Sequence, residues 1–100
     1  MATRPPTPKL PKRADLFDRP EVVKAIHACR LRIAANLRRL RAAEGWSQEV
    51  AAEKIGIHAI HLVRLEGGQP DVKLSTLVAA ALAYNIEPRA LLRPQRTRRR

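Results

Sequence analysis

The sequence predicts a small all-α protein, and three observations support this fold class. Hydrophobic residues make up 45% of the 100 residues and aromatic residues only 3%, so the core must be aliphatic. Alanine and leucine, which favour helices, outnumber the β-branched residues that favour strands. Apolar residues also recur at spacings of three and four between Val22 and Leu40, as on one face of a helix. A chain of this length suits one domain with a single core.

The first helix is expected to begin at Asp18, a good capping residue, with Pro20 in its first turn. No glycine or proline interrupts the chain from there to Glu44, and Gly45 ends the helix. The sequence leaves open whether this stretch is one long rod or two segments that meet near residues 30–32.

Residues 18–32 form an N-terminal helical extension in either case, and they carry more apolar residues than a compact domain needs. Val22, Val23, Ile26 and Cys29 continue the stripe into this segment. Two interpretations follow: the extension folds back on the domain, or it contacts a second copy or another partner and makes a homodimer.

Two short helices follow, separated by a tight turn. Ser47 predicts the N-cap of a helix over 48–55, and the turn Gly56-Ile57-His58 leads into the next helix, 59–66. A break at 67–70 comes before the fourth helix.

The fourth helix is expected over 74–84, with Asn85 in the left-handed conformation after its end. Its predicted apolar face consists of Leu74, Leu77, Val78, Ala81 and Leu82. Pro88 opens a fifth, short helix through Leu92.

The net charge of +11 lies mostly outside the middle of the chain. Residues 1–32 hold eight basic and three acidic side chains, residues 33–92 hold seven and six, and residues 93–100 hold five and none. We therefore predict a Pro-rich basic arm over 1–17 and an Arg-rich tail over 93–100, both extended or disordered. Charge of this sign indicates an anionic partner.

Several functional classes are not expected. A single cysteine excludes an intramolecular disulfide, no apolar run approaches a membrane span, and the N-terminus lacks a signal-peptide core, so a cytoplasmic location is expected. The sequence has no phosphate loop and no nucleophile with a matched histidine and acid, so we expect no enzymatic activity and no cofactor. His58 and His61 lack further ligands at suitable spacing, so no metal is expected.

The motifs from residue 33 to residue 92 resemble the Cro/phage-repressor (XRE-type) family of helix-turn-helix DNA-binding domains. They comprise Leu-Arg-Arg-Leu-Arg at 37–41, Gly-Trp-Ser-Gln at 45–48, Ala-Glu-Lys-Ile-Gly-Ile at 52–57, Leu-Val-Arg-Leu-Glu at 62–66, Leu-Ser-Thr-Leu at 74–77 and Tyr-Asn-Ile at 84–86. The resemblance implies a five-helix phage-repressor-like domain that binds double-stranded DNA. It also implies a bacterial or phage regulator of transcription that is associated with the nucleoid when bound.

The resemblance also implies roles for individual residues. Gln48 corresponds to the residue that contacts a phosphate and braces the recognition helix, while Arg41 and Glu66 correspond to a semi-buried ion pair. The implied base-contacting positions are His58, Ala59, Ile60, Val63 and Arg64. The implied phosphate contacts come from Arg41, Gln48, His58 and His61, with non-specific contacts from the tail residues Arg93, Arg96, Arg98, Arg99 and Arg100.

The recognition helix departs from the usual composition, because Ala59, Ile60 and Val63 offer no hydrogen bonds to base edges. Either these side chains pack on thymine methyl groups while Arg64 supplies the polar contact, or the face binds a protein partner. The first alternative predicts a repressor-like transcriptional regulator. The second predicts an antitoxin that binds a toxin and its own promoter.

Overall fold

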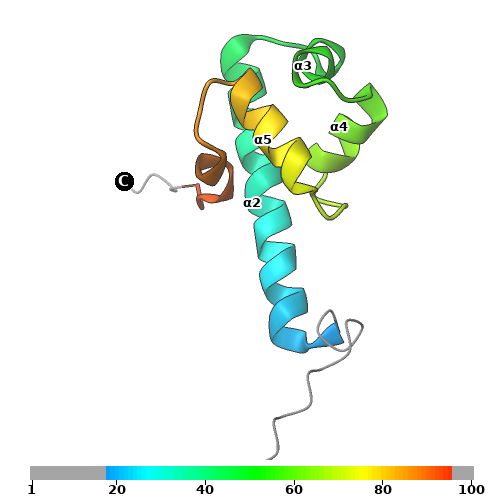
Figure 1. Cartoon of the computed structure of the whole chain (residues 1–100), viewed down its shortest axis with the longest axis vertical. Helices are drawn as coiled ribbons and strands as arrows, with labels where there is room; N and C mark the ends of the chain where they lie inside the picture. The colour runs from blue at the N-terminus through cyan, green and yellow to red at the C-terminus, as the bar shows by residue number, and fades with distance from the viewer. Residues whose placement is uncertain (1–17, 96–100) are drawn as a thin grey trace, which may run out of the picture.

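The computed structural model describes residues 18–95, and its helices surround one aliphatic core (Figure 1). The described part contains no strand, which confirms the all-α class. Its elements are α2 (Pro20–Glu44), α3 (Gln48–Ile55), α4 (Ala59–Glu66), α5 (Leu74–Ala83) and the 3₁₀ helix η1 (Pro88–Leu92). The predicted arm, residues 1–17, and the tail residues 96–100 lie outside the described residues.

The expectation of five α-helices is wrong for the described residues, which contain four α-helices and a final 3₁₀ helix. The last element does begin at Pro88, as the sequence predicts. It spans only five residues, a length at which the tighter i→i+3 bonds are common, and it ends at Leu92 before the extended backbone of Arg93.

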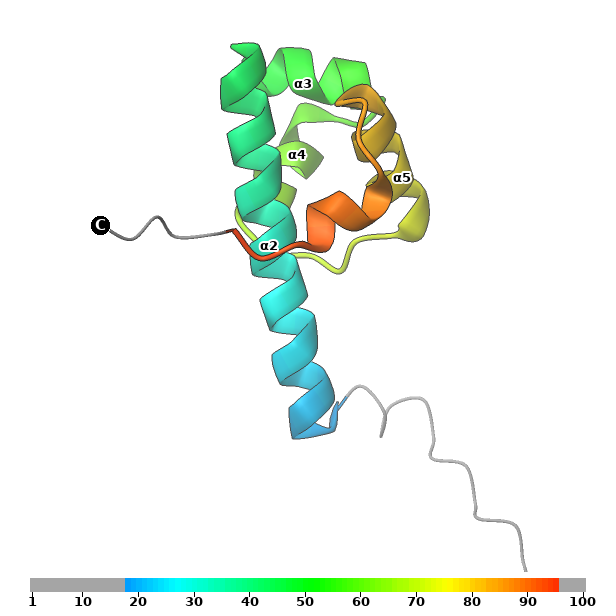
Figure 2. The ribbon, with the colours of Figure 1, turned by 90° about the vertical axis from the view of Figure 1, so that its left-hand side faces the viewer.

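Helix α2 is one continuous rod, which resolves the alternative of two segments (Figures 1 and 2). It begins at Pro20 with Arg19 as its N-cap, rather than Asp18, and no side chain caps it. The other helices gather along its C-terminal half, and its N-terminal half extends beyond them (Figure 2). The helix ends at Gly45, which has the left-handed conformation. The N–H groups of Gly45 and Trp46 donate hydrogen bonds to carbonyls of the last turn.

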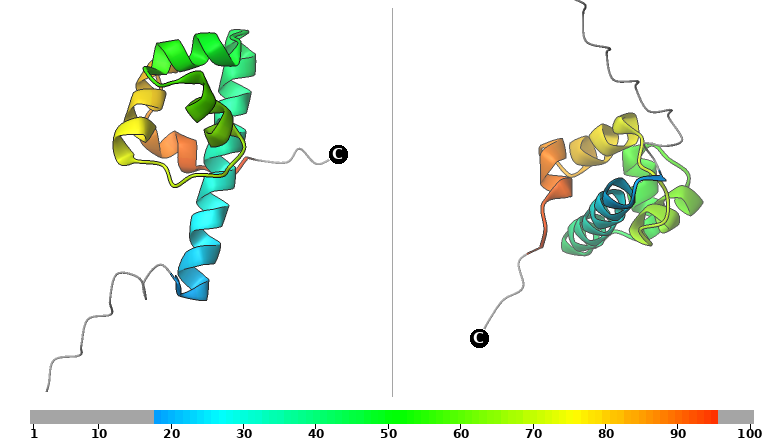
Figure 3. Two further views of the ribbon diagram at one scale, coloured as in Figure 1. Left: turned by 90° about the vertical axis from the view of Figure 1, so that its right-hand side faces the viewer. Right: turned by 90° about the horizontal axis from the view of Figure 1, so that it is seen from below.

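Helices α3 and α4 form a closely packed pair, one at the end of α2 and the other against its side (Figure 3). The Ser47 hydroxyl accepts a hydrogen bond of 3.1 Å from the Val50 N–H and so caps α3, as predicted. Gly56 ends α3 with a φ of 93°, a conformation that favours glycine, and this permits the tight turn into α4.

The core is built from large aliphatic side chains that alternate with alanines. Leu37, Leu62, Leu65 and Leu91 are the largest fully buried side chains. Small buried residues allow the helices to approach closely, and they are Ala34, Ala51, Ala52, Ala80 and Ala81. Burial on α2 begins at Ile33, and no residue from 20 to 32 is buried.

The predicted apolar face of α5 is only partly the buried one. Ala81 is buried and Leu77 packs against the core, but Leu74 is 73% exposed and Leu82 74% exposed, with Val78 also exposed. The helix instead turns small residues inward, because a close approach to the core leaves little room for leucine. Asn85 has a φ of 55°, as predicted for the residue after this helix.

Two further findings concern the part of the chain that the structure describes. None of its helices combines the length and the apolar character that a membrane crossing requires. Within residues 18–95, no three His, Cys, Asp or Glu side chains gather as ligands of a metal ion would.

Candidate nucleic-acid interface

Glu66, the last residue of α4, is a buried carboxylate, and Arg41 of α2 pairs with it through two hydrogen bonds. Arg41 Nε lies 2.8 Å from Glu66 Oε2, and Arg41 Nη2 lies 3.0 Å from Oε1. Arg41 Nη1 also donates to the Trp46 carbonyl at 3.1 Å. The hydrogen bond that Arg41 donates to Glu66 raises the pKa of the Arg41 guanidinium, which keeps this side chain protonated. The ion-pair positions implied by the resemblance therefore lie in direct contact.

Two more side chains join Glu66 to the neighbouring helices. Gln48, the first residue of α3, donates from Nε2 to Glu66 Oε1 at 3.1 Å. Arg38 of α2 donates to the main-chain carbonyl of Glu66. We call Arg38, Arg41, Gln48 and Glu66 the Glu66 brace. Because it joins α2, α3 and the end of α4, it sets the orientation of α4 relative to the rest of the domain.

The outward face of α4 carries Ile60, Val63 and Arg64, which share one side of the helix at spacings of three and four. Ile60 is 62% exposed and Val63 43% exposed, and Arg64 is also exposed. Ala59, by contrast, is half-buried and packs against the core. Of the predicted base-contacting residues on the helix, three therefore form one accessible surface and Ala59 lies at its edge.

The two histidines lie at the start of α4. His58 occupies the N-cap position and is exposed, but its side chain makes no capping hydrogen bond. His61 is half-buried. The positive end of the helix dipole lies beside His58, which suits the approach of a phosphate.

The predicted phosphate contacts differ in how their donors are used. Three nitrogens of Arg41 already donate inside the protein, and the Gln48 amide donates to Glu66. Both side chains therefore act first as parts of the brace. Their predicted phosphate contacts would have to come from the remaining N–H groups.

Behind the brace, Trp46 stacks on Tyr84 with ring centroids 5.3 Å apart. Lys54 belongs to α3, and its ammonium group lies 5.9 Å from the centre of the Trp46 ring. The Tyr84 hydroxyl is buried and has no hydrogen-bond partner among the described residues. Burial raises the pKa of the Tyr84 phenol, and the negative charge of Glu66 adds to this effect.

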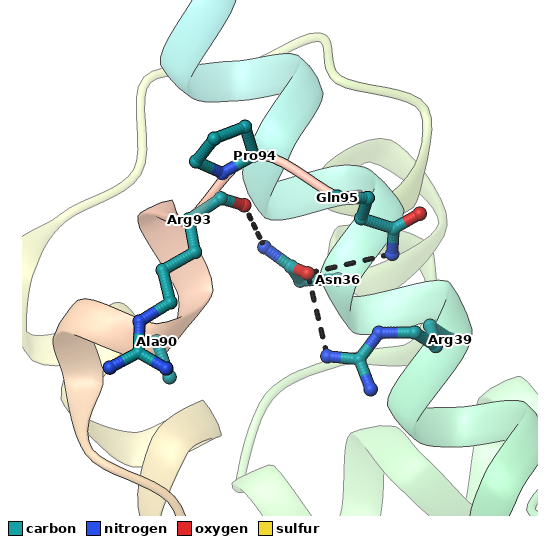
Figure 4. Close-up of a pocket in the computed structure, with 6 residues that line it drawn as sticks. All are labelled: Asn36, Arg39, Ala90, Arg93, Pro94 and Gln95. Atoms are coloured by element: carbon teal, nitrogen blue, oxygen red, sulfur yellow. Dashed lines mark hydrogen bonds between the residues drawn. The ribbon is translucent and has the colours of Figure 1, made fainter. Parts of the chain in front are cut away.

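Asn36 is a buried polar residue that the sequence reasoning did not single out. Its Nδ2 donates to the carbonyls of Leu91 and Arg93, at 2.9 Å each. Figure 4 shows its amide between Arg93, Gln95 and Arg39, at a pocket of about 360 Å³. The residue holds η1 and the following segment against α2. An asparagine between Ile33 and Leu37 on an apolar stripe was the available signal.

The chain leaves the domain on the side of α2 away from α4 (Figures 1 and 3). Arg93 is exposed there, and the Gln95 amide donates to the Ala35 carbonyl at 3.1 Å. The other predicted tail contacts, Arg96, Arg98, Arg99 and Arg100, lie outside the described residues.

Comparison with known proteins agrees with this geometry. A family model described as a helix-turn-helix domain matches residues 32–95. The crystal structure of a hypothetical transcription factor, NHTF from Neisseria, is similar with a TM-score of 0.66 and 29% identity over 69% of this chain and 78% of that chain. The restriction-modification controller protein C.AhdI from Aeromonas hydrophila is similar with a TM-score of 0.59 and 37% identity over 62% of this chain and 94% of that chain. No curated protein matches the sequence.

Proposed function

Because the chain belongs to the helix-turn-helix domain family, we propose that it is a sequence-specific, repressor-like regulator of transcription that binds double-stranded DNA. One observation carries the proposal: the Glu66 brace holds α4 with Ile60, Val63 and Arg64 on its outward face. A helix presented in this way fits the major groove, which is about 12 Å wide. The two similar structures, a hypothetical transcription factor and a restriction-modification controller protein, support the same class.

In this proposal Arg64 reads sequence through its guanidinium, which can donate two hydrogen bonds to guanine. Ile60 and Val63 supply apolar contacts to thymine methyl groups, with Ala59 at the edge of the surface. His58, at the N-cap of α4, lies where a side chain reaches either a base or a phosphate.

Phosphate contacts from Gln48, His61 and the arginine tail would position the protein without reading sequence. The domain over 33–92 has seven basic and six acidic side chains, so little of the affinity comes from its own net charge. The basic segments on either side of it would supply the non-specific component.

The proposal is tested by selecting bound sequences from a random pool of double-stranded DNA with the full chain at a stated salt concentration. We expect enrichment of one short sequence in two symmetric copies, because homodimeric regulators of this class bind two half-sites. Equal recovery of all sequences would contradict sequence-specific binding.

A second candidate function is an antitoxin, or another interaction module, that binds a partner protein and its own promoter. The exposed Ile60 and Val63 favour it, because adjacent apolar side chains on a surface mark contact sites between proteins. Purification of the chain from its native host distinguishes the candidates. If a small partner protein co-purifies with the chain and is lost on Ile60→Asp substitution, the antitoxin function is supported. A DNA footprint by the purified chain alone supports the transcriptional regulator.

A further inference from the structure

An apolar groove lies where the N-terminal half of α2 leaves the domain. It has a volume of about 510 Å³ and is lined by Val22, Ile26 and Cys29 from α2 and by Val72, Leu77 and Leu92 from the domain. The α2 residues in this half lie largely ahead of the family match, which begins at residue 32. The helix-turn-helix domain therefore forms one wall of the groove, and a segment largely outside the family match forms the other.

We propose that a second copy of this chain occupies the groove, with its own α2 extension lying antiparallel to the first. The stripe of Val22, Ile26 and Cys29 would then pack against the same three residues of the other copy. Leu77 and Leu92, on the domain wall of the groove, would pack against the flank of the second copy's α2 extension. Such an interface is self-complementary, as a two-fold dimer requires.

Charge argues for a second copy in this orientation. Glu21 lines the groove, and the exposed Arg32 directly precedes Ile33, another lining residue. About three helical turns separate these residues, so both flank the stripe on the same side. In an antiparallel pair centred between these two residues, Glu21 of each copy faces Arg32 of the other, so opposite charges meet at both ends of the stripe. Glu21 also forms an ion pair of 3.0 Å with Arg19. Both side chains are exposed, so the Glu21 carboxylate is accessible to a second copy.

The position of α4 gives a second argument, which rests on the proposed DNA-binding function. A two-fold axis midway between Glu21 and Arg32 lies about 17 Å along α2 from Arg38, which binds the end of α4. The two attachment points would therefore be about 35 Å apart along the helices, close to the ~34–36 Å between half-sites one turn apart on DNA.

The two α4 helices would also face the same way. Arg38 and Arg41 lie roughly 100–150° around α2 from the apolar stripe. A two-fold axis perpendicular to both extensions then keeps both α4 helices on one side of the pair. A single DNA duplex could therefore meet both.

Analytical ultracentrifugation of the full chain without DNA tests the interface directly, over concentrations on the order of 1–100 µM. We expect a dimer that Ile26→Glu weakens by about a hundredfold, because both copies lose an apolar anchor. The matched control is His27→Glu, which adds the same residue at the neighbouring, exposed position. Circular dichroism checks that each variant remains folded. A chain that stays monomeric, or equal effects of the two variants, would overturn the proposal.

A charge exchange tests the antiparallel orientation with exposed residues only. Glu21→Arg and Arg32→Glu should each weaken the dimer by about threefold to tenfold, and the double variant should recover the original affinity. Failure of the double variant to recover would overturn the antiparallel pairing.

The exposed stripe of α5 provides the competing surface. If Leu82→Glu dissociates the dimer and Ile26→Glu does not, the interface lies on α5 and the proposal is wrong. Binding of DNA is measured separately by fluorescence anisotropy. A dimer that binds no DNA would contradict the proposed function alone, and DNA binding by a monomer would contradict the dimer alone.

Discussion

Glu66 is the only buried charged residue among residues 18–95, and its carboxylate accepts hydrogen bonds from α2 and α3. Loss of this carboxylate would leave the Arg41 guanidinium without its partner in a site only 24% exposed. We predict that Glu66→Ala lowers the free energy of unfolding by about 2–4 kcal/mol. Urea denaturation followed by circular dichroism measures the change.

The matched control for Glu66 is Glu87→Ala, because Glu87 pairs with Arg89 on the exposed surface. Its effect should stay within about 0.5 kcal/mol. A similar loss in both variants would show that burial of the Glu66 pair does not matter for stability.

The Tyr84 hydroxyl predicts a pH dependence. Burial raises its pKa above the usual value of 10.0, so the folded chain holds the phenol proton more tightly than the unfolded chain. The resulting stability is complete below about pH 10 and is lost as the pH rises toward the folded-state pKa. The comparison of Tyr84→Phe with the original chain isolates this effect from the titration of lysines.

We expect Tyr84→Phe to be neutral or slightly stabilising at pH 7, because the hydroxyl has no hydrogen-bond partner among the described residues. Above about pH 10 the variant should lose less stability than the original chain. Thermal unfolding at a series of pH values measures both, and parallel profiles for the two proteins would contradict the prediction.

Among the helices, α4 carries the proposed sequence readout. We predict that Arg64→Ala lowers discrimination at one base position by about 1–3 kcal/mol while it changes non-specific binding little. Competition binding against matched and mismatched sites measures the difference. Equal losses on every sequence would instead assign Arg64 to the DNA backbone.

The packing of η1 on α2 depends on Asn36. Asn36→Leu keeps the volume but leaves the carbonyls of Leu91 and Arg93 without their donor, so we predict a loss of about 1–3 kcal/mol of stability. Gln95→Ala serves as the control, because this exposed residue should contribute less than about 0.5 kcal/mol. Chemical denaturation compares them, and equal effects would contradict a special role for the buried amide.

For the chain as a whole, most of the net charge lies outside the helix-turn-helix domain. The domain over 33–92 is nearly neutral, whereas residues 93–100 add five arginines. We predict that deletion of residues 96–100 weakens binding to all DNA sequences alike. It should also reduce the slope of log affinity against log salt by roughly 3–4, if each of its arginines contacts a phosphate. An unchanged slope would exclude such contacts.

Local signals were sufficient to predict most helix boundaries. The structure agrees with the predicted Ser47 cap, the helix ends at Gly45 and Gly56, the left-handed Asn85 and the start of the last helix at Pro88. These features depend on backbone preferences and on hydrogen bonds between residues near in sequence, so they can be recognised without knowledge of the fold.

Which side of α5 is buried could not be predicted in the same way. Its leucines and alanines are all apolar, so periodicity alone did not distinguish the face that packs inward from the face with Leu74 and Leu82. The role of Asn36 was missed for a related reason, because its partners are more than fifty residues away.

The sequence alone therefore determined the all-helical class, the helix-turn-helix segment and the concentration of net charge outside that segment. The helical class and the distribution of charge follow from composition and short-range spacing, and the helix-turn-helix segment follows from motifs that resemble a known family. The structure shows that α2 is continuous. Tertiary packing determined that α5 turns its alanines inward, and that Asn36 and the Glu66 brace connect distant segments. These outcomes depend on which surfaces meet in space, and burial and hydrogen bonding across the fold set them.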